Sequence, residues 1–126
     1  NKVKFKIFTG ITSAQAALRE VKEQSSNTKL CLNLITGHKQ IKTYSRQINY
    51  DYLVNTEGRV LVYMGVSQIE SISNNLIKSG MKKSTKIFII SNASLENQII
   101  YNTNLKDITN FVKDNEVKPP SIIIIK

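Results

Sequence analysis

Val60-Leu61-Val62-Tyr63-Met64-Gly65 is an apolar run of strand length that stops at a glycine, and it gives the strongest indication of the class of fold. A continuous apolar run without polar alternation predicts a strand that is buried on both faces. Sheets that contain such strands are covered by helices on each side. We therefore expect this run to lie inside a layered α/β domain.

Strand-like runs recur on both sides of this stretch. Similar apolar runs predict strands at 30–35, 87–90 and 121–125. Residues 2–7 alternate lysine with apolar side chains, which is typical of a half-buried strand, and we expect a further short strand at 98–101. The short interval between 87–90 and 98–101 predicts an antiparallel hairpin.

Helical patterns alternate with these strands. Residues 12–23 carry apolar side chains at helical spacing. The stretch 67–70 reads as a capping box that opens a second helix, and Gly80 stands where that helix would stop. A third helix is expected after a cap at Asn104, and residues 39–57 read as a polar loop with a short helix. The alternation predicts an α/β fold with a mostly parallel or mixed five-stranded sheet flanked by helices.

Length and composition fit one domain over residues 1–126. Hydrophobic residues make up 40% of the chain and charged residues 21%, which is typical of a globular protein. No apolar run approaches the roughly 18–20 residues of a membrane span. The single cysteine, Cys31, rules out a disulfide within the chain and favours a reducing, cytoplasmic location. The chain begins with Asn1, so we expect it to be part of something longer.

The net charge of +9 leaves several partners open. A basic balance is compatible with a solvated lysine-rich surface, an acidic small molecule or nucleic acid. The lysines are scattered, and no basic run is interleaved with aromatic residues. We therefore expect no nucleic-acid partner, and we keep a basic binding module as an alternative.

Little catalytic chemistry is visible in the residues themselves. His38 is the single histidine, so no histidine cluster for a metal exists, and Cys31 falls in an expected buried strand and reads as packed. We predict no catalytic residue. Small residues follow several strands, and in open α/β sheets ligands gather at the carboxyl ends of strands.

Five segments together resemble one known family. In order and spacing they are similar to the C-terminal domain of uroporphyrinogen-III C-methyltransferases, which are tetrapyrrole methylases. The segments are Gly10-Ile11-Thr12-Ser13-Ala14, Leu34-Ile35-Thr36-Gly37-His38, Val60-Leu61-Val62-Tyr63-Met64-Gly65, Ile90-Ser91-Asn92-Ala93-Ser94 and Pro119-Pro120-Ser121-Ile122-Ile123-Ile124.

The resemblance implies a homodimeric enzyme of two α/β domains, with S-adenosylmethionine in the cleft between them. That enzyme methylates two ring carbons of uroporphyrinogen III to give precorrin-2, the branch point to sirohaem and cobalamin, without a metal. The chain would be the C-terminal half and one wall of the cleft, because the family's glycine-rich N-terminal loops are not in it. We therefore expect the chain alone to be inactive and to bind the cofactor poorly.

The resemblance also implies four cofactor-binding residues. Thr12 and Ser13 match a pair that contacts the cofactor, although either could be a plain helix cap. Met64 matches a methionine that packs on the cofactor, the alternative being a core methionine. Ala93 matches a small residue whose backbone meets the adenine, the alternative being an ordinary turn residue. His38 is expected to be structural.

Some positions depart from the family pattern. Thr9 stands in place of a proline, Ile99 in place of an arginine, and Lys126 in place of a closing glycine; residues 21–27 and 102–104 also differ. These departures bear on substrate recognition and dimer packing. A methylase of the same family that acts on another substrate therefore remains a second alternative.

Overall fold

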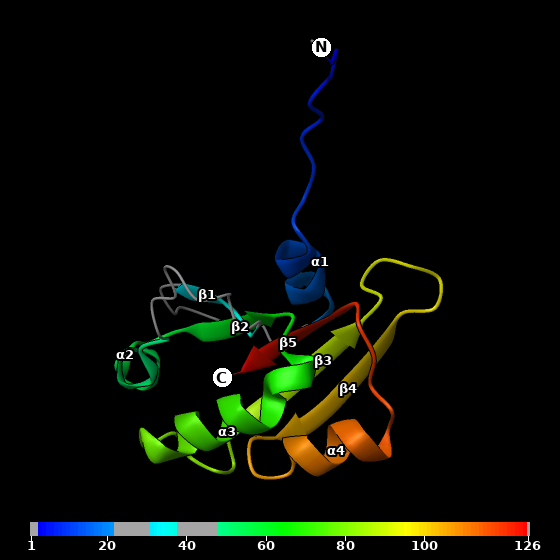
Figure 1. The fold of residues 1–126 in the computed structure, drawn as a ribbon. Coiled ribbons are helices and arrows are strands. Elements are labelled where there is room, and N and C mark those ends of the chain that lie inside the picture. The colour runs from blue at the N-terminus through cyan, green and yellow to red at the C-terminus, as the bar shows by residue number, and fades with distance from the viewer. Residues whose placement is uncertain (1–2, 22–30, 38–47, 126) are drawn as a thin grey trace.

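A computed structural model of the chain describes residues 3–21, 31–37 and 48–125 (Figure 1). The helices and strands in chain order are α1 (Ser13–Glu20), β1 (Leu32–Thr36), α2 (Tyr50–Asn55), β2 (Arg59–Tyr63), the 3-10 turn η1 (Val66–Gln68), α3 (Ile69–Lys78), β3 (Lys86–Ser91), β4 (Ile99–Asn104), α4 (Ile108–Asp114) and β5 (Ser121–Ile125). None of the helices in these described ranges is long and apolar enough to cross a membrane.

The five strands form one mixed sheet in the order β1-β2-β5-β3-β4. β1 and β2 are parallel, whereas β2 and β3 each run antiparallel to β5, and β3 and β4 form the predicted antiparallel hairpin. The predicted five-stranded mixed sheet flanked by helices is confirmed. Its antiparallel share is larger than the helix–strand alternation indicated, because the last strand enters the middle of the sheet in the opposite direction.

Helices cover both faces of the sheet (Figure 1). On one face α2, α3 and α4 pack over a core that includes Ile123 and Ile125 of β5. On the other face α1 packs over Ile122 and Ile124. Successive side chains of a strand point to opposite faces, so the isoleucine run of β5 serves both cores. All five residues of β5 are buried, as a run of this kind predicts.

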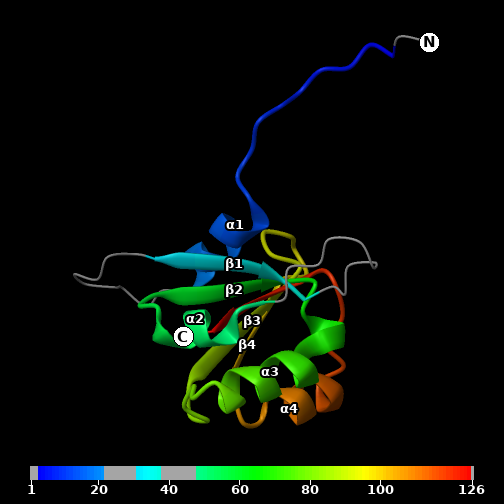
Figure 2. The same ribbon diagram turned by 60° about the vertical axis from the view of Figure 1, so that its left-hand side comes forward.

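The strand expected at 2–7 is wrong over the residues that the structure describes. Residues 3–12 form no helix or strand, and they extend away from the body (Figures 1 and 2). Val3 is 81% exposed and Phe5 82% exposed. An alternating pattern indicates which side chains would share one face of a strand. Whether that strand pairs with a sheet edge depends on long-range contacts, which the local pattern does not encode.

Several element boundaries also differ from the expectation. The capping box at 67–70 does not form: Ser67 lies in η1, and Gln68 precedes α3 without a side-chain cap. Asn104 ends β4, and its Oδ1 accepts the Asp107 N–H at 3.0 Å, so α4 begins only at Ile108. α2 confirms the short helix expected within 39–57. The parts of the expected elements at 22–30 and 39–47 lie outside the described residues.

The strand expected to bury Cys31 is an edge strand. Cys31 is half-buried and precedes β1, and its carbonyl accepts the Arg59 N–H at 3.0 Å. Leu34 in the middle of β1 is 58% exposed. Among the described strands β1 pairs only with β2, so this apolar strand lies at the edge of the sheet.

We expect Ile123→Ala to lower the free energy of unfolding by about 2–5 kcal/mol, because Ile123 is fully buried in the central strand and its truncation leaves a cavity. Phe5→Ala is the matched control and should leave stability unchanged. Urea denaturation of the two variants measures both effects. A comparable loss for Phe5→Ala would mean that the N-terminal segment packs on the domain.

Candidate ligand-binding pocket

A pocket of about 560 Å³ lies at one end of the sheet. β2 and β3 end there, and β5 begins there, because Ser121 pairs with Ser91 in the antiparallel register. The pocket therefore lies at the carboxyl ends of two strands, as open α/β sheets lead one to expect. Apolar side chains make up most of its lining.

Three of the four predicted cofactor residues line this pocket: Ser13, Met64 and Ala93. They come from the start of α1, the end of β2 and the loop after β3. Thr12 does not line it. Its Oγ1 accepts the Gln15 N–H at 3.2 Å and the Gln15 Oε1 accepts the Thr12 N–H at 2.8 Å, so the helix-cap interpretation of Thr12 is confirmed. His38 lies outside the described residues.

Met64 occupies a backbone conformation that suits few side chains. Its φ is 49°, and its side chain is 60% exposed. A left-handed conformation at a residue other than glycine costs about 1–3 kcal/mol, and such residues gather at ligand sites. The alternative of a core methionine is wrong, since Met64 is largely exposed and lines the pocket.

Two glycines hold this strand end in place. The Gly37 N–H donates to the Tyr63 carbonyl at 2.7 Å. A Cβ on Gly37 would lie 2.7 Å from the Gly65 Cα, and a Cβ on Gly65 would lie 2.6 Å from the Val62 Cγ1. At Gly37 the close neighbour is backbone, which excludes any side chain there, whereas a side chain at Gly65 would require the buried Val62 side chain to shift. The glycines after β1 and β2 therefore serve strand packing at the base of the pocket.

The wall formed by Pro119 and Pro120 is fixed by a short chain of hydroxyls. The Ser121 hydroxyl donates to the Lys118 carbonyl at 2.6 Å, so the Ser91 hydroxyl is the donor in the 2.8 Å bond between the two serines. The Asn92 N–H donates to the Pro120 carbonyl at 3.0 Å. These bonds satisfy the polar groups that lie beneath the apolar wall.

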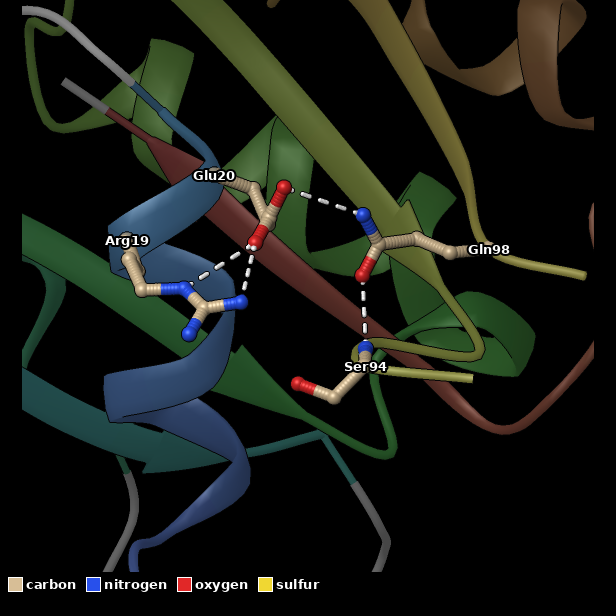
Figure 3. A network of polar contacts seen from close by, with 4 residues as sticks. All are labelled: Arg19, Glu20, Ser94 and Gln98. Atoms are coloured by element: carbon tan, nitrogen blue, oxygen red, sulfur yellow. Dashed lines mark hydrogen bonds and ion pairs between the residues drawn. The ribbon is translucent and has the colours of Figure 1, made fainter. Parts of the chain in front are cut away.

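The loop between β3 and β4 also lines the pocket, next to the proline wall. Asn92 and Ser94 have φ values of 53° and 68°, and Ala93 stands between them. Gln98 ties this loop to α1: its Nε2 donates to the Glu20 Oε2 at 3.1 Å and its Oε1 accepts the Ser94 N–H at 2.6 Å (Figure 3). Ala93 therefore faces the pocket from a loop that is hydrogen-bonded at both ends.

Sequence reasoning did not single out several lining residues, notably Tyr63, Asn92, Leu95 and the two prolines. Tyr63 also carries a contact that no local pattern encodes, since its hydroxyl accepts the Ala14 N–H at 3.2 Å. Most of these residues belong to the same strand-end phrases as Met64 and Ala93. Treating each whole phrase as a pocket wall would have found them.

The lining offers shape and hydrogen bonds but little acid–base chemistry. Within the described residues it contains no Asp, Glu, Lys, Arg or His, and no three acidic, cysteine or histidine side chains there gather in a way that could hold a metal. Hydroxyls, backbone groups, a thioether and apolar surface suit the binding of an amphipathic organic molecule. The described lining can therefore orient a ligand through its hydroxyls, backbone groups and apolar surface.

The family model and the curated relatives that match this chain point to the same family. The family model of the Tetrapyrrole (Corrin/Porphyrin) Methylases matches residues 1–109. The siroheme synthase of Hahella chejuensis is 30% identical over 98% of this chain, which covers 26% of that protein. A porphyrin biosynthesis protein of Ruminiclostridium josui is 28% identical over 99% of this chain, which covers 25% of that protein. The chain thus spans about a quarter of these curated relatives.

Solved structures share the fold. A cobalt precorrin-4 methyltransferase superposes with a TM-score of 0.81 at 16% identity, over 95% of this chain and 51% of that chain. The uroporphyrin-III C-methyl transferase of Thermus thermophilus, solved with S-adenyl homocysteine, superposes with a TM-score of 0.72 at 18% identity, over 95% of this chain and 51% of that chain. Because the family model covers most of the chain, the chain belongs to the Tetrapyrrole (Corrin/Porphyrin) Methylases.

Proposed function

We propose that this chain supplies one wall of the S-adenosylmethionine site in a methyltransferase that converts uroporphyrinogen III to precorrin-2. The observation that carries the proposal is that Ser13, Met64 and Ala93, which lie far apart in sequence, line one pocket. The solved Thermus thermophilus relative named above was crystallised with a cofactor product, which supports the same class of ligand.

The chemistry of the lining agrees with this ligand. Ala93 is small, so an aromatic ring can approach the backbone of its loop, and the exposed Met64 thioether offers a soft surface to a purine or a sulfonium. The Ser13 hydroxyl adds a polar contact. When bound, the cofactor supplies the activated methyl group, and these residues would orient it and exclude water.

We propose further that residues 1–126 are a single domain forming the C-terminal half of a two-domain cytoplasmic homodimer. In its support, this chain covers about half of the solved relatives. The other wall of the cleft would come from the second domain, and the chain alone would then be inactive. The net charge of +9 is complementary to the carboxylates of uroporphyrinogen, which favours that substrate class.

The first test is calorimetric titration of S-adenosylhomocysteine into this chain and into the full-length natural protein that contains it. We expect micromolar binding to the full-length protein and binding at least about 100-fold weaker to the chain, because one wall makes only part of the contacts. Absence of binding to both would contradict the methyltransferase proposal. Equal binding to both would contradict the shared cleft.

A second test separates the ligand role of Met64 from a structural one. Met64→Gly should keep or raise the melting temperature, because glycine adopts a φ of 49° without strain, yet it should weaken S-adenosylhomocysteine binding about 10-fold through the lost contact surface.

Glu116→Gly is the matched control. Glu116 also has a positive φ, 48°, but does not line the pocket, so this variant should gain stability without any change in ligand affinity. Unchanged affinity in Met64→Gly would remove Met64 from the site.

A further inference from the structure

Two of the parts that line the pocket lie far apart in the sequence. α1 contributes Ser13, and the loop of residues 92–98 contributes Asn92, Ala93 and Leu95. The loop and the helix are joined by a hydrogen bond between Gln98 and Glu20, which are 78 residues apart (Figure 3). A long-range side-chain contact thus joins these two parts of the pocket, in addition to the packing of α1 on the sheet.

The chemistry of Gln98 fits this position on both sides. A carboxylate is an acceptor only, and a backbone N–H is a donor only. Glu20 therefore requires the amide Nε2 of Gln98, at 3.1 Å, and the Ser94 N–H requires the amide Oε1, at 2.6 Å. The reverse orientation of the amide would place like groups together at both contacts.

Glu20 is itself held in place. Its Oε1 accepts from the Arg19 Nε at 3.3 Å and the Arg19 Nη2 at 3.2 Å, which leaves Oε2 for Gln98. The Glu20 side chain is only 23% exposed, whereas that of Arg19 is 75% exposed. The carboxylate is thus partly shielded from water by α1 and the loop, and a bond from an amide to a charged acceptor is stronger there than a neutral one.

The other end of the bond acts on the loop backbone. Ser94 has a φ of 68°, and its N–H donates a hydrogen bond to the Gln98 Oε1. The loop is closed further by Leu95 N–H to Asn92 carbonyl at 2.9 Å and by Gln98 N–H to Leu95 carbonyl at 3.0 Å. A strained residue persists only where its surroundings hold it, so loss of the Gln98 contact should release the turn next to Ala93.

We propose that Gln98 is a positioning residue for the pocket: by bridging Glu20 and the Ser94 N–H, it fixes the loop that carries Ala93 relative to the helix that carries Ser13. Its effect on ligand affinity rests on the proposed function, whereas its effect on the loop does not. Gln98 does not line the pocket, so it acts through Ala93 and not by touching the ligand.

A reciprocal exchange tests the bridge in the full-length protein. In Gln98→Glu two carboxylates face each other, and we expect S-adenosylhomocysteine affinity to fall about 10-fold at pH 8. As the pH falls toward the carboxyl range, one carboxyl becomes protonated and can donate to the other, so the affinity of this variant should recover relative to the unmodified protein at the same pH. A role in folding alone would not produce this pH profile at a constant melting temperature.

The double variant Glu20→Gln with Gln98→Glu restores a donor and an acceptor in exchanged positions. The new carboxylate accepts both the amide of residue 20 and the Ser94 N–H, so affinity should return to within about 3-fold of the original at every pH. Asn97→Asp is the matched control, because it adds the same charge to the same loop without touching the bridge, and it should bind normally. Normal binding by Gln98→Glu, or no rescue by the double variant, would overturn the proposal.

Amide hydrogen exchange at Ser94, measured by NMR in this chain without ligand, tests the bridge independently of the proposed function. We expect exchange about 10-fold faster in Gln98→Glu at pH 8 than in the original chain, after correction for intrinsic rates, and restored protection in the double variant. If the full-length protein fails to bind S-adenosylhomocysteine, the proposed function fails and this exchange series alone judges the bridge. Unchanged Ser94 exchange in Gln98→Glu would overturn it.

Discussion

The complete burial of β5 is the constraint on which the rest of the structure depends. Its five residues are buried, and it pairs with β2 on one side and β3 on the other. Such a strand leaves no backbone group for water, so both neighbours must be present and in register. That register brings Ser121 beside Ser91, and it thereby places the Pro119–Pro120 wall at the ends of β2 and β3, where the pocket lies.

Each wall of the pocket is held by a different interaction. The close approach of Gly37 and Gly65 fixes the end of β2, hydroxyl bonds fix the turn before β5, and a side-chain amide fixes the loop after β3. Met64 and Asn92, which line the pocket, and Ser94, which follows Ala93 in the same loop, have positive φ. Within the described residues Glu116 is the one other non-glycine residue with positive φ, and it does not line the pocket; the grouping of the remaining three at the ends of β2 and β3 is a physical reason to regard that end of the sheet as the functional one.

The departures from the family pattern lie elsewhere. Within the described residues, Thr9 is exposed in the N-terminal segment, Ile99 is 49% exposed on the edge strand β4, and Asn104 bonds to Asp107; none of them lines the pocket. The departures that fall within the described residues therefore lie outside the lining of the pocket.

The amino-acid pattern alone indicated the layered α/β class, buried strands at 60–64, 87–90 and 121–125, the hairpin of β3 with β4, and a helix cap at Thr12 or Ser13, which the structure assigns to Thr12. These features follow from neighbouring residues, so a linear pattern can encode them, whereas the exposure of β1 and the missing capping box at 67–70 depend on where each segment packs. The resemblance singled out Ser13, Met64 and Ala93, yet only the tertiary structure decided that they share one pocket and that Thr12 does not.

Strand direction, the unpaired state of residues 3–12 and the bridge from Gln98 to Glu20 also required the tertiary structure. Each depends on pairings between segments tens of residues apart. The free energy of such a pairing comes from contacts between distant segments, so the hydrophobic periodicity within one segment does not predict it.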